Sequence, residues 1–165
     1  MSLAAAASAV SALDAVRDVA RDRVGNDAGY AGDVTASEAW TLLKETPDAV
    51  LIDVRTPPEW AFTGVPDLRE LKKDLVTISW RSFPTYEVNP QFMAHLAEVA
   101  PSKNAPLVFL CRTGGRSLDA ARAATAAGYA ICFNVLDGFE GPMNEFEQRG
   151  GTAGWKAEGI PWRQT

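Results

Sequence analysis

The sequence predicts an α/β fold in which helices cover both faces of a mostly parallel central sheet. Four short apolar runs, centred near residues 50, 77, 108 and 133, have the composition of buried strands. Segments rich in helix-forming residues alternate with these runs, as is typical of parallel strands joined by helical crossovers. Parallel strands are covered on both faces, which explains why the runs are continuously apolar.

Composition restricts the class of protein. The chain has 165 residues, enough for one domain with an extension, and 47% of them are hydrophobic. A net charge of −5 argues against a nucleic-acid surface. Two cysteines are too few for a disulfide framework, and no metal-ligand cluster or cofactor motif is present. A cysteine that acts as a free thiol needs reducing surroundings to stay available, so we expect a cytoplasmic protein.

The first 24 residues have helical periodicity, and residues 25–32 have the composition of a linker. The missing basic start and the charges from Asp14 onward argue against a signal peptide or a membrane span. We therefore divide the chain into an N-terminal helix and linker, 1–32, and a domain, 33–165. The helix is expected to pack on the domain or on a second copy in a homodimer. Its apolar positions are Leu3, Ala6, Val10, Leu13, Val16, Ala20 and Val24.

The elements of the domain follow in order. Thr35 and Glu38 predict a capping box for a helix that ends before Pro47. A strand over 49–55 leads into a short helix that begins with two prolines. A strand over 75–80 is followed by a helix with Asn89 as its N-cap. The remaining expected elements are a strand over 106–110, a helix from 117 with Gly128 beyond its end, a strand over 129–136 and a helix over 142–148.

A cysteine stands where the strand over 106–110 ends, and a glycine-containing loop then leads into a helix. Gly114 and Gly115 permit positive φ, so successive N–H groups can converge on one point. Arg112 and Arg116 add forked donors suited to an oxyanion. Helix N-termini and arginines favour the thiolate form of a neighbouring cysteine. This pattern predicts that Cys111 is a nucleophile within an anion cradle.

The loop Cys-Arg-Thr-Gly-Gly-Arg-Ser at 111–117 resembles the active-site loop of rhodanese-type sulfurtransferases. The resemblance extends over about 33–163, through Asp-Val-Arg at 53–55, an acidic-aromatic pair at 59–60 and a closing Gly-Gly…Trp…Gly-x-Pro pattern. It implies a rhodanese-like domain in which Cys111 carries a persulfide and Arg55 and Glu59 are architectural. The histidine that relatives commonly carry after Gly64 is missing. The substrate-binding loop residues would be Arg112, Thr113, Gly114, Gly115, Arg116 and Ser117.

The resemblance implies an enzyme that moves a sulfane sulfur from a small anionic donor, such as thiosulfate, to cyanide, a thiol or a protein acceptor. Phosphatases and arsenate reductases on a similar scaffold are a second hypothesis, but their loops place five residues between cysteine and arginine. Four residues separate Cys111 from Arg116 here, which favours sulfur. A third hypothesis is a non-catalytic sulfur-relay module that docks a protein partner.

Several residues outside the loop are weaker candidates. Asp53 ends its strand on the same sheet edge as Cys111, so it either braces the loop or caps the strand. Trp80, Arg81 and Phe83 either shape access to Cys111 or pack over the domain. The remaining two candidates have weaker settings: His95 is mid-helix without a companion acid, and Cys132 lies mid-strand, which favours packing over catalysis.

Overall fold

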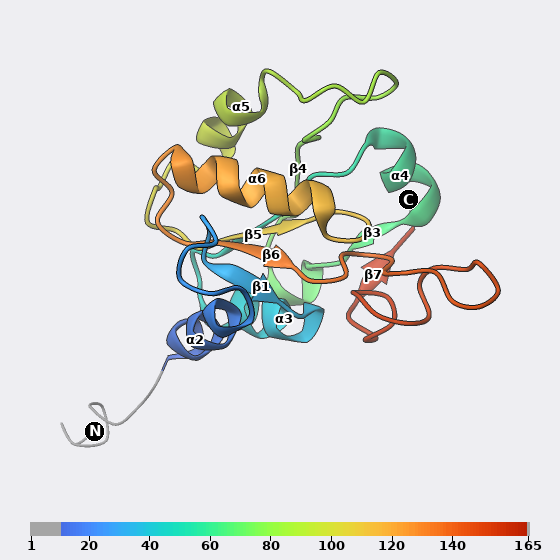
Figure 1. The fold of residues 1–165 in the computed structure, drawn as a ribbon, viewed down its shortest axis with the longest axis horizontal. Helices are drawn as coiled ribbons and strands as arrows, with labels where there is room; N and C mark the ends of the chain where they lie inside the picture. The colour runs from blue at the N-terminus through green and yellow to red at the C-terminus, as the bar shows by residue number, and fades with distance from the viewer. Residues whose placement is uncertain (1–10, 165) are drawn as a thin grey trace.

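The computed structural model describes residues 11–164, which form a five-stranded parallel sheet with helices on both faces (Figure 1). The strands follow the order β1-β6-β5-β2-β4, and all four pairings are parallel. This confirms the predicted fold class. The strands are β1 Gly32–Val34, β2 Val50–Asp53, β4 Val76–Thr77, β5 Leu107–Leu110 and β6 Cys132–Val135.

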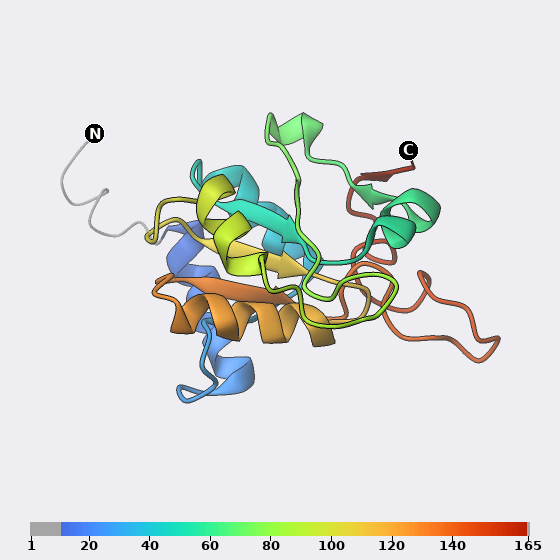
Figure 2. The same ribbon diagram turned by 90° about the horizontal axis from the view of Figure 1, so that it is seen from above.

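The sheet divides the apolar core into two layers, one on each of its faces, and Figure 2 looks onto one of these faces. Helices α2 (Ala12–Val24) and α3 (Ala36–Glu45) cover one face, and α5 (Phe92–Val99) and α6 (Gly115–Ala126) cover the other. The remaining elements are α4 (Pro57–Thr63), the antiparallel pair β3 (Val65–Pro66) and β7 (Trp162–Arg163), and the 3₁₀ turn η1 (Arg69–Leu71). None of the helices formed by residues 11–164 is long and apolar enough to span a membrane.

Helix α2 packs on the domain, because Val16 and Ala20 are buried in the same cluster as residues of β1 and α3. Ser11 is its N-cap and its side chain accepts a hydrogen bond from the Asp14 amide. Residues 1–10 of the predicted helix lie outside the described residues. A homodimer through this helix stays a prediction.

Local sequence signals, such as capping residues and glycines, mark the ends of several helices. The capping box of Thr35 and Glu38 is present at the start of α3, and Gly128 follows α6 with φ 103°. Helix α5 begins at Phe92, later than expected, because Asn89 accepts a hydrogen bond from the Gln91 amide within a turn.

The predicted helix over 142–148 is wrong. The Asn144 side chain accepts hydrogen bonds from the amides of Phe146 and Gln148, and this local bonding replaces helical bonds. Met143 and Phe146 are exposed, so no apolar face would stabilise a helix there.

Strand β1 was not expected, because residues 25–32 have the composition of a linker. It pairs with β6 and starts at Gly32, whose φ is 134°. A β-carbon at Gly32 would overlap the backbone of Ala20 in α2. Glycine therefore allows the helix to lie directly against the edge of the sheet.

Substitution Gly32→Ala is expected to lower the free energy of unfolding by about 3 kcal/mol or more, because α2 must move away from β1. Urea denaturation measures the change. Gly25→Ala is the matched control: its φ is 85° but nothing lies within 4 Å of the added carbon, so only backbone strain of about 1–2 kcal/mol is expected. Equal losses in the two variants would contradict the steric explanation.

Candidate active site

Cys111 directly follows β5, and its side chain is almost wholly buried, with 1% relative exposure. Its Sγ accepts a hydrogen bond from the Gly114 amide at 3.1 Å and lies 3.1 Å from the Ser117 hydroxyl. Gly114 has φ 105°, which turns its N–H back toward the sulfur. The loop thus curls back so that the Gly114 amide faces the sulfur.

The main-chain amides of the loop form a cradle. Within residues 11–164, the N–H groups of Arg112, Thr113, Gly115, Arg116 and Ser117 have no hydrogen-bond acceptor. Three of them belong to the first turn of α6, where the helix dipole favours negative charge. These donors suit an anion bound above the sulfur.

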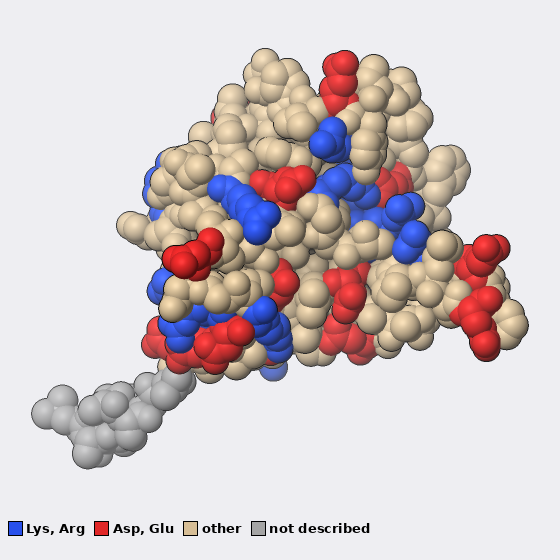
Figure 3. All heavy atoms as spheres, viewed as in Figure 1, with Lys and Arg blue, Asp and Glu red and all other residues tan. Residues whose placement is uncertain are grey.

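The two loop arginines have different settings. Arg116 forms a two-pronged ion pair with Glu59 of α4, at 2.7 and 2.9 Å. Burial raises the pKa of Glu59, but the hydrogen bonds and charge of Arg116, the Thr56 hydroxyl and the charge of Arg55 together lower it below its ordinary value. Arg112 is exposed, and basic side chains gather over the N-terminal end of α6 (Figure 3). Arg112 is therefore the loop arginine whose guanidinium is open to solvent.

A segment after β6 supports the loop from behind. The amides of Phe139 and Glu140 donate to the carbonyls of Cys111 and Arg112 at 2.8 and 3.0 Å. A β-carbon at Gly138 would lie 2.6 Å from the Cys111 carbonyl oxygen. This role was missed from the sequence, although the Asp-Gly pair after a strand signals a tight turn there.

Asp53 and Arg55 form an ion pair in which both side chains are fully buried, with Arg55 Nη2 2.6 Å from Asp53 Oδ2. Asp53 makes no side-chain bond to the active-site loop within the described part of the chain; its bonds all go to Arg55. The Arg55 guanidinium in turn lies over the Phe139 ring at 4.2 Å. Asp53 therefore reaches the loop indirectly, through Arg55 and Phe139.

The aromatic loop after β4 reaches the site through Tyr86, which the sequence analysis did not single out. The guanidinium groups of Arg81 and Arg116 each lie 5.6 Å from its ring. Trp80 instead packs edge-on against Phe92 in the core, and Phe83 is 62% exposed.

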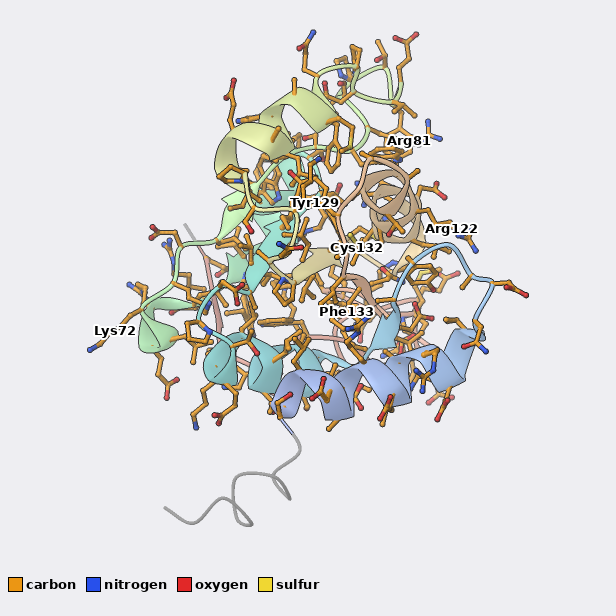
Figure 4. All side chains as sticks on the ribbon, turned by 90° about the vertical axis from the view of Figure 1, so that its left-hand side faces the viewer. Lys72, Arg81, Arg122, Tyr129, Cys132 and Phe133 are labelled. Atoms are coloured by element: carbon orange, nitrogen blue, oxygen red, sulfur yellow. The ribbon has the colours of Figure 1, made fainter. Side chains whose placement is uncertain are left out.

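His95 and Cys132 lie apart from this arrangement. His95 is exposed on α5, and the side-chain partners of Cys111 among residues 11–164 are Gly114 and Ser117. Cys132 is buried inside the domain (Figure 4), and burial raises the pKa of its thiol to about 11. Such a thiol stays protonated and unreactive near neutral pH.

Comparison with known proteins identifies relatives of this chain. Residues 31–165 match the family model described as the STR4 middle domain. The crystal structure of Rv0390 from M. tuberculosis is 46% identical, with a TM-score of 0.76, and the match covers 82% of this chain and 99% of that one.

Two curated relatives are named for their domain or activity. A thylakoid rhodanese-like chloroplast protein of Oryza sativa is 34% identical over 79% of this chain and 25% of its own length. A sulfurtransferase of Allochromatium vinosum is 28% identical over 72% of this chain and 82% of its own length.

Substitution Glu59→Gln is expected to lower the free energy of unfolding near pH 7 by on the order of 1–3 kcal/mol. Because the pKa of Glu59 is lower in the folded state, its stabilisation is present above the ordinary glutamate pKa and is lost as the pH falls through the folded value. The difference between variant and wild type should therefore shrink in acid, as measured by urea denaturation at several pH values. Glu98→Gln, on an exposed residue of α5, is the control, and a pH-independent difference for Glu59→Gln would contradict the ion-pair explanation.

Substitution Gly138→Ala is expected to slow the alkylation of Cys111 by iodoacetamide, because the added carbon displaces the Cys111 and Arg112 carbonyls. Mass spectrometry of the Cys111 peptide gives the rate. Gly128→Ala is the control, since Gly128 also has positive φ but its added carbon meets nothing within 4 Å. Unchanged alkylation in a folded Gly138→Ala variant would show that this segment does not shape the loop.

Proposed function

Since the chain belongs to the STR4 middle-domain family, a rhodanese-like family, we propose that it is a sulfurtransferase that acts through a persulfide on Cys111. The observation on which this proposal rests is that main-chain amides without acceptors curl around a buried thiol. These donors would stabilise an anionic outer sulfur as an oxyanion hole stabilises developing charge. The name of the Allochromatium relative adds support for sulfur transfer.

The proposed reaction has two steps. The Cys111 thiolate attacks the outer sulfur of a donor such as thiosulfate; the donor's S–S bond breaks, and sulfite leaves with the electron pair. The product is Cys111–S–S⁻. An acceptor thiolate or cyanide then attacks the outer sulfur, and the Cys111 thiolate is restored. Arg112 would guide the anionic donor, whereas Arg116, bonded to Glu59, would hold the loop.

The loop length supports sulfur over phosphate, because four residues separate Cys111 from Arg116. Both cysteines are free thiols, as the proposal requires. The expected cytoplasmic location, a location with reducing conditions, stays a prediction, as does the division at residue 33.

Exposure to thiosulfate is expected to add about 32 Da, the mass of one sulfur atom, to the Cys111 peptide. The adduct should disappear in Cys111→Ser and persist in the control Cys132→Ser. Intact-mass analysis with peptide mapping makes the measurement, and a thiosulfate:cyanide assay tests turnover. An adduct without turnover of small acceptors would favour a sulfur relay to a protein, and hydrolysis of aryl phosphates without an adduct would overturn the proposal.

A further inference from the structure

Behind Cys111, a chain of hydrogen bonds runs away from the active-site loop into the domain. The Ser117 hydroxyl lies 3.1 Å from Cys111 Sγ and 2.5 Å from Asn134 Oδ1. Asn134 Nδ2 donates to Asp33 Oδ1 at 3.1 Å, and the Tyr30 hydroxyl donates to the same oxygen at 2.7 Å. Ser117 and Asn134 are buried, at 0% and 3% exposure, so water does not substitute for these partners.

The directions of these bonds are fixed from the far end. A carboxylate only accepts hydrogen bonds, so Asp33 holds the Asn134 amide with its N–H₂ group toward Asp33 and its oxygen toward Ser117. Burial and the hydrogen bond to Asp33 raise the pKa of Tyr30, which therefore remains a donor. Arg122 of α6, which is labelled in Figure 4, donates to the Ala28 carbonyl and lies over the Tyr30 ring. These contacts anchor this end of the chain of hydrogen bonds.

Ser117 consequently has two acceptors for one hydrogen. When Cys111 is a thiol, its S–H can donate to Ser117 Oγ while Ser117 donates to Asn134. When Cys111 is a thiolate, the sulfur only accepts, and the Ser117 hydroxyl can donate to it only by turning its hydrogen away from Asn134. The buried Asn134 oxygen then has no donor, which opposes the change.

We propose that Asn134 is a positioning residue that competes with Cys111 for the Ser117 proton and so restrains thiolate formation in the resting protein. The inference rests on the proposed function, because sulfur transfer gives the restraint on thiolate formation its purpose. In the persulfide the negative charge resides on the outer sulfur and the inner sulfur is neutral, so the Ser117 hydrogen returns to Asn134. The network thereby favours the sulfur-loaded state over the free thiolate.

Other charged groups also act on the Cys111 sulfur. Arg116 of α6 interacts electrostatically with Cys111 and is paired with Glu59 of α4. Arg112 lies in the same loop as Cys111, and Asp33 of β1 lies behind Asn134. A change at Asn134 must therefore be separated from a general change in the electrostatics of the site. Variants with and without the Ser117 hydroxyl separate the two effects, because the proposed competition exists only when that hydroxyl is present.

The test is the pH profile of Cys111 alkylation by iodoacetamide, followed by mass spectrometry of the Cys111 peptide. Asn134→Leu removes the competing acceptor at similar volume. The midpoint of the profile should fall, and alkylation below the midpoint should rise about three- to tenfold, the factor supplied by one ordinary hydrogen bond. In the Ser117→Ala background, Asn134→Leu should leave the midpoint unchanged. An equal shift in both backgrounds, no shift, or an upward shift with Ser117 present would overturn the proposal.

If Asn134→Leu does not fold, Asp33→Asn carries the same cycle. The new amide lets the Asn134 amide turn over, so that Asn134 Oδ1 accepts from the new amide and Nδ2 faces Ser117, whose hydrogen is then free to reach the sulfur. The outcomes also distinguish this inference from the proposed function, since alkylation needs no sulfur donor. A Ser117-dependent shift in a protein that never retains sulfur would support the proton competition and refute the sulfurtransferase. Sulfur retention without that shift would refute the competition alone.

Discussion

The buried ion pair of Asp53 and Arg55 is the constraint on which the site depends. Both side chains have no exposure, and removal of either would leave an unpaired buried charge. The Arg55 guanidinium also donates to the Gly64 carbonyl at the end of α4, and it stacks on Phe139. One side chain thus ties the end of β2, the end of α4 and the segment that supports the cysteine loop.

The backbone of the loop is supported by main-chain contacts with the segment after β6. Gly138 lies against the carbonyls of Cys111 and Arg112, and its own carbonyl accepts from the Trp155 amide. Trp155 is wholly buried, and its indole N–H donates to the Pro161 carbonyl. The C-terminal segment around Trp155 therefore supports the segment around Gly138, which in turn supports the loop that forms the cradle. Arg116, which is bonded to Glu59, belongs to the same framework.

Two kinds of surroundings meet at the cysteine. The amides in front of it favour any anion placed above the sulfur. The polar chain through Ser117 and Asn134 behind it responds to where the proton lies, because the Ser117 hydroxyl has a single hydrogen. Under the proposed function both surroundings fit a persulfide on Cys111, because its negative charge lies on the outer sulfur near the amides and the Ser117 hydrogen stays with Asn134.

The sequence by itself determined the parallel sheet, the position of Cys111 at a strand end and the composition of its loop, because apolar runs, caps and glycines act over a few residues. It did not determine β1, whose three residues become a strand only by pairing with β6, or the absence of a helix over 142–148, where Asn144 bonds locally. The partners of Arg116 and Ser117 were likewise decided only by the tertiary structure. Their contacts join segments distant in the chain, Glu59 with Arg116 and Asn134 with Ser117, and no local pattern specifies which distant groups meet.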